Sequence, residues 1–66
     1  MKVQFDGKAD AIYFRLDDAP IAESEEVEPG VVLDYNDQNQ VVGIEILGVK
    51  ARVPIASLRQ MHFEVA

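Results

Sequence analysis

The stretch VVLDYNDQNQVVGIEIL, residues 31–47, decides the fold. Its two apolar runs, 31–35 and 41–47, are rich in β-branched residues, which favour strands. Five polar residues separate the two runs, and Asn39 among them suits a backbone position with positive φ. Two such runs joined by a short polar turn predict an antiparallel β-hairpin.

A second hairpin is predicted on the N-terminal side of the first. Residues 2–5 and 11–16 both alternate apolar and polar side chains, and the turn-forming residues 6–10 separate them. The second of these runs places Ile12, Phe14 and Leu16 on one side of a half-buried strand.

Residues 17–30 leave two interpretations open. The ladder ends at Asp17-Asp18-Ala19-Pro20, and Pro29-Gly30 is a strong turn signal. Between them, residues 21–28 form either an acidic edge strand or an extended loop, since no apolar stripe is present to hold a helix.

The periodicity changes after Gly48. Pro54 can occupy the first turn of a short helix that carries Ile55, Leu58 and Met61 on one face, and residues 62–65 form a short strand or a packed tail. The predicted fold is therefore α+β: a single domain, residues 1–66, with an antiparallel sheet of about four strands in two hairpins. One short C-terminal helix is expected to pack on a face of that sheet.

Composition excludes several classes of protein. The chain has no cysteine, which rules out disulfides, thiolate metal sites and cysteine nucleophiles. Its six basic residues are scattered, so direct binding to nucleic acid or to an anionic membrane is not expected. Neither a membrane-spanning apolar run nor a signal-peptide segment is recognisable, and a soluble, cytoplasmic protein of prokaryotic type is expected. Because so short a chain buries little surface, we also expect a homodimer.

The net charge of −6 is concentrated in residues 17–28, which contain six acids and no base. Two interpretations remain open: a docking surface for a basic partner protein, or a solvated edge whose charges prevent edge-to-edge aggregation. The acids are Asp17, Asp18, Glu23, Glu25, Glu26 and Glu28.

Four polar residues are expected to share the outer face of the sheet. Tyr13 and Arg15 point away from Ile12 and Phe14, and strand alternation gives Asp34 and Glu45 the same outward sense. The four side chains are candidates for a small-ligand site, for an interface with a second subunit, or for cross-strand ion pairs that only stabilise the sheet.

No catalytic residue, metal or cofactor is predicted. The segment 34–45 departs from a calcium loop at Gln38 and Asn39, and His62 has no companion ligands. There is also no nucleophile elbow and no glycine-rich phosphate loop.

The blocks DAIYFRL (10–16), ESEEV (23–27), GVVLDY (30–35) and VVGIEIL (41–47) occur in an order that resembles a known family. The family is the small prokaryotic domain of unknown function 2283, and the resemblance covers about residues 3–47. It implies a compact β-rich α+β domain and no established activity. It also implies small stand-alone proteins, some of which are suspected of pairing with a toxin-like neighbour.

Three hypotheses for function follow. The first is a non-enzymatic interaction module, antitoxin-like in one version, which docks a basic partner through residues 17–28. The second is a small-ligand-binding or weakly catalytic domain that uses Tyr13, Arg15, Asp34 and Glu45. The third is purely structural homo-oligomerisation.

Overall fold

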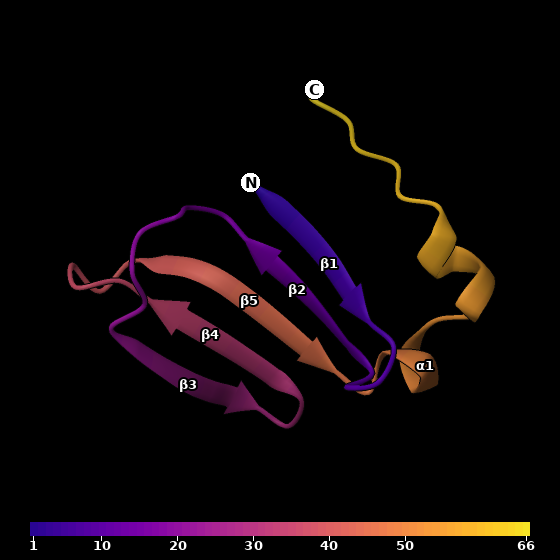
Figure 1. Ribbon diagram of the computed structural model, residues 1–66, viewed down its shortest axis with the longest axis horizontal. Helices are drawn as coiled ribbons and strands as arrows, with labels where there is room; N and C mark the ends of the chain where they lie inside the picture. The colour runs from indigo at the N-terminus through magenta and orange to yellow at the C-terminus, as the bar shows by residue number, and fades with distance from the viewer.

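Five antiparallel strands form one sheet in the computed structural model, which describes residues 1–66 (Figure 1). The order across the sheet is β1-β2-β5-β4-β3, so the two predicted hairpins meet where β5 lies beside β2. The strands are β1 (Lys2–Asp6), β2 (Ala11–Arg15), β3 (Glu23–Glu28), β4 (Val31–Tyr35) and β5 (Val41–Leu47).

The fifth strand comes from the segment for which strand and loop were both predicted. Every residue of β3 is exposed, and only one side of β3 is hydrogen-bonded, to β4. Pairing with a neighbour rather than an apolar pattern therefore makes this segment a strand. The prediction of about four strands was one too few, whereas the α+β class is confirmed.

Two short helices take the place of the single predicted C-terminal helix. A short helix, α1 (Val49–Arg52), precedes Pro54, and a 3-10 helix, η1 (Ile55–Arg59), follows it. With three residues per turn, a 3-10 helix keeps residues three apart on one side, which is why the spacing of Ile55 and Leu58 suggested a helix. Met61 lies beyond η1, and residues 62–65 form no strand.

Cross-strand pairing aligns apolar side chains in two rows on one side of the sheet. Residues paired across strands point to the same face, so each row can be followed from β1 to β4. One row ends at Glu25 of β3 and the other at Glu28. These eight residues are the apolar face: Val3, Phe14, Ile44 and Leu33 in the first row, and Phe5, Ile12, Ile46 and Val31 in the second.

No second layer covers the apolar face. Figure 1 shows α1, η1 and the C-terminal residues on the β1 side of the sheet, away from β4 and β3. The predicted packing of a helix on a face is therefore limited to the β1–β2 edge. Leu16, which was expected to continue the inner side of β2, lies beyond the strand and is 44% exposed.

The fully buried hydrophobic side chains are few and small. They are Ala11, Val42 and Val49. Val49 is held by the backbone of the first hairpin, because its N–H donates to the Asp10 carbonyl at 3.1 Å and the next N–H donates to the Asp10 carboxylate at 3.0 Å. Asp10 thus fixes α1 against the β1–β2 turn, from a position of positive φ.

Candidate functional site

Polar side chains from three strands, β2, β3 and β4, join in one hydrogen-bonded cluster on the face opposite the apolar face. The Tyr13 hydroxyl donates to Asp34 Oδ2 at 2.8 Å, and the Ser24 hydroxyl donates to Asp34 Oδ1 at 2.6 Å. Arg15 Nη1 donates to the Tyr13 oxygen at 3.1 Å. Each carboxylate oxygen of Asp34 therefore accepts a hydrogen bond. Asp34 is the one buried charged residue of the chain.

Gly43 provides the space for this cluster. It lies on β5 between Arg15 of β2 and Asp34 of β4. A Cβ atom at this position would stand 2.5 Å from the Tyr13 hydroxyl oxygen and 2.9 Å from Asp34 Oδ2. The Tyr13 phenol and the Asp34 carboxylate therefore meet directly over the Gly43 backbone, which they can approach closely because glycine has no side chain.

Arg15 links the cluster to the loop after β2. Its Nε donates to the Asp17 carbonyl at 2.6 Å, and its Nη2 donates to the Ala19 carbonyl. The hydrogen bond with the Tyr13 hydroxyl raises the pKa of Arg15 above its ordinary value, while partial desolvation opposes that shift. The guanidinium remains cationic and braces the turn that leads toward β3.

Glu45, the fourth candidate, shares the face but not the cluster. It pairs with Tyr13 across β2 and β5, and no hydrogen bond or ion pair joins it to another side chain. It borders an open hollow of about 230 Å³. The other residues that line this hollow are Gln4, Asp6, Ala9, Ala11 and Tyr13.

Cross-strand ion pairs, one of the three interpretations of these residues, do not form, because the Tyr13 hydroxyl lies between the guanidinium and the carboxylate. No salt bridge joins Arg15 to Asp34 or Glu45, and the one short contact between a basic and an acidic side chain is that of His62 with Glu64. Tyr13, Arg15 and Asp34, three of the four candidates, are joined to one another by hydrogen bonds. Together with Ser24 they link β2, β4 and β3 across β5.

Four of the six acids of residues 17–28 lie on the edge strand β3, Asp17 and Asp18 lie in the loop that follows β2, and the six do not share one face. Glu25 pairs with Leu33 and so lies on the side of the apolar face, whereas Glu26 pairs with Val32 on the opposite side. Asp17 turns inward to its own loop, where its carboxylate accepts a hydrogen bond from the Ala19 N–H at 2.8 Å. The acids are therefore divided between an edge strand and a loop, and they do not line one site.

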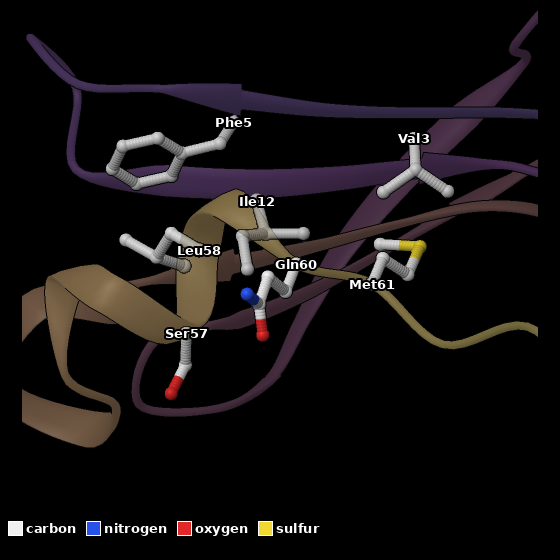
Figure 2. A pocket seen from close by; sticks show the side chains of 7 residues that line it. All are labelled: Val3, Phe5, Ile12, Ser57, Leu58, Gln60 and Met61. Carbon is white, nitrogen blue, oxygen red and sulfur yellow. The ribbon is translucent and has the colours of Figure 1, made fainter.

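A second hollow, of about 320 Å³, lies between η1 and the β1–β2 part of the apolar face. Figure 2 shows Leu58 directed toward Phe5 and Ile12, with Met61 near Val3, while Ser57 points away. The C-terminal segment thus covers this part of the sheet only loosely.

The sequence did not predict that the apolar face would be left uncovered. Alternation in each strand predicts an inward side, and a helix was expected to cover it. The available signal is the shortness of the helical pattern after Gly48, where only Ile55, Leu58 and Met61 share a predicted helix face, too few to cover two rows of apolar side chains.

No group of three or more histidine, cysteine, aspartate or glutamate side chains is arranged to hold a metal ion. None of the helices has both the length and the apolar character needed to cross a membrane.

Fold and site together define a small α+β domain built on one antiparallel sheet, with a polar cluster on one face and apolar rows on the other. The chain belongs to the family described as Protein of unknown function (DUF2283), whose sequence model matches residues 2–50. The resemblance seen over residues 3–47 is thereby confirmed. No curated protein matches the chain, and no solved structure does either.

Proposed function

We propose that this chain is a non-enzymatic protein-interaction module. The observation that carries the proposal is the apolar face, of whose eight side chains none is buried. Six of them lie on β2, β4 and β5, the inner strands of the sheet, where side chains normally form the core. A contiguous apolar patch of this kind on a small domain is typical of a binding surface.

The charge distribution supports a basic protein as the partner. Four of the six acids of residues 17–28 lie on β3, an edge strand of the sheet, and Asp17 and Asp18 lie in the loop that follows β2. Negative charge beside such an edge raises the association rate for a basic partner and disfavours acidic ones. One form of this function is antitoxin-like, in which the acidic chain covers a basic nuclease surface.

The test is affinity capture of the tagged chain from host lysate at low and at high salt, with identification by mass spectrometry. We expect one basic protein that is retained at low salt and reduced at high salt, because screening weakens exposed charge pairs. The double substitution Asp18→Lys with Glu26→Lys should reduce its retention about tenfold or more. Both residues are exposed, so the fold should not change.

The control adds positive charge on the side of the sheet away from β3. Gln4→Lys on β1 with Glu64→Lys near the C-terminus alters exposed residues outside the acidic segment and should leave capture unchanged. Equal capture by the wild type and by the Asp18→Lys, Glu26→Lys variant would show that the acidic segment does not dock the partner.

A second candidate function is small-ligand binding beside Glu45. The observation in its favour is a carboxylate without a partner at the edge of an open hollow. A thermal-shift screen with small cations, sugars and nucleotides tests it. A stabilising ligand whose effect is lost in Glu45→Gln, but kept in the control Glu64→Gln, would favour this function over the interaction module.

A further inference from the structure

The molecule exposes more surface than a compact monomer of its mass. Its accessible surface is 5185 Å², whereas a folded 7.3 kDa monomer is expected to expose about 4,200 Å². The excess of about 1,000 Å² compares with the roughly 800 Å² that each partner buries in a standard protein–protein interface. The radius of gyration, 12.7 Å, likewise exceeds the roughly 11 Å expected for this length.

The missing layer lies over one half of the sheet. Residues of η1 and Met61 lie over parts of β1 and β2, but nothing in the chain covers the apolar side chains of β5 and β4. Stable domains pack at least two layers around a core. The uncovered half therefore needs a second apolar surface of similar size.

The C-terminal segment, residues 60–66, has the character of a strand without a neighbour. Gln60 has extended backbone angles, φ −131° and ψ 119°. His62 Nε2 and Glu64 Oε1 lie 2.8 Å apart, as fits two side chains on one side of an extended chain. Alternation places Phe63 on the other side of the segment from His62 and Glu64. Phe63 is 70% exposed, and Met61 and Val65, which share its side, are 63% and 85% exposed.

We propose that a second copy of this chain covers the β5–β4–β3 half of the apolar face, and that its C-terminal segment lies along the outer edge of β3. The inference rests on the proposed interaction function: a second copy takes the apolar half-sheet and the edge of β3, while acids that face away from that contact, such as Glu26, remain open to a basic partner. Each copy offers the same two surfaces, an uncovered half-sheet and an unpaired extended segment. A two-fold axis satisfies both surfaces of both copies at once.

Charge selects between the two ways of stacking the sheets. An axis perpendicular to the strands would place β3 over β3, so that the acidic edges repel each other. An axis parallel to the strands, near β4, instead places β3 of one copy beside η1 and the C-terminal segment of the other. Glu25, which lies on the apolar side of β3, then approaches Arg59 of the other copy, and Arg59 has no ion pair within its own chain.

The test uses sedimentation equilibrium on the full chain. Phe63→Asp should raise the dimer dissociation constant about tenfold or more, because it places a charge in the contact of the C-terminal segment. The exposed position of Phe63 means that the monomer fold is not at risk. Gln4→Asp, which adds a negative charge at an exposed position on the opposite face of β1, is the control and should leave the constant unchanged.

A charge exchange tests the direction of stacking. Glu25→Arg and Arg59→Glu should each raise the dissociation constant about fivefold, and the double variant should restore most of the affinity. If the two single effects simply add in the double variant, the proposed stacking is wrong.

Hydroxyl-radical labelling of the same samples separates failure of this inference from failure of the proposed function. A dimer in which Leu33 and Ile44 lose labelling on association supports the inference. A monomer with both residues strongly labelled overturns the dimer but leaves the face open to a different partner. A monomer in which both are protected by the chain's own C-terminal segment overturns the dimer and the interaction module together.

Discussion

Replacing Gly43 by alanine is expected to lower the free energy of unfolding by about 2–3 kcal/mol. The new Cβ would stand 2.5 Å from the Tyr13 hydroxyl oxygen, so the phenol must move. Movement of the phenol breaks its hydrogen bond to Asp34 and the one it accepts from Arg15. Urea denaturation followed by circular dichroism measures the change, which is large beside the stability of so small a domain.

Gly7→Ala is the matched control. A Cβ at Gly7 meets only Phe5 Cε2, at 3.7 Å, which is ordinary contact. We expect a change within about 0.5 kcal/mol for this exposed turn position. Equal stability of the Gly43→Ala and Gly7→Ala variants would mean that the phenol and the carboxylate are not held over the Gly43 backbone.

Replacing Asp34 by alanine is expected to lower the free energy of unfolding by about 2–3 kcal/mol. The carboxylate is 8% exposed and accepts hydrogen bonds from both Tyr13 and Ser24. Its removal leaves two partly buried hydroxyl groups without their acceptor. Chemical denaturation of the variant measures the loss.

Two further variants define what the Asp34 result means. Asp37→Ala removes an exposed carboxylate in the β4–β5 turn and should change stability by less than about 0.5 kcal/mol. Tyr13→Phe should cost about 1 kcal/mol, and less when Asp34 is already alanine, because the two share one hydrogen bond. Wild-type stability in the Asp34→Ala variant would show that the hydrogen bonds of the cluster do not stabilise the fold.

Much of the sheet was predictable from local pattern. The hairpins at residues 2–16 and 31–47 follow from period-two alternation and turn residues, and Asn39 adopts the expected positive φ of 61°. The strand β3 was not predictable with certainty, because its residues have no buried side and its strand character comes from pairing with β4. Pairing between distant segments leaves no local signature.

The shared face of the four candidate residues followed from alternation, but their bonding did not. Alternation places Tyr13, Arg15 and Asp34 together, and opposite charges suggested direct ion pairs. The outcome depends on Gly43, which lets the phenol reach between the guanidinium and the carboxylate. Such a contact depends on tenths of an ångström across neighbouring strands, a detail that residue spacing does not contain.

The strongest consequence of the fold is that the sheet has one layer. On one face the side chains of the polar cluster are joined by hydrogen bonds, whereas the side chains of the apolar face remain in contact with water. Since apolar burial is the main favourable term in folding, we expect the stability of this protein to depend on its concentration.

The most direct test of this account is an isotope-filtered nuclear Overhauser experiment on an equal mixture of labelled and unlabelled chains. The account predicts intermolecular contacts from the Ile44 and Leu33 methyl groups, and contacts between Phe63 of one copy and β3 of the other. Intermolecular contacts confined to the face of Tyr13 and Asp34, or their complete absence at millimolar concentration, would contradict it.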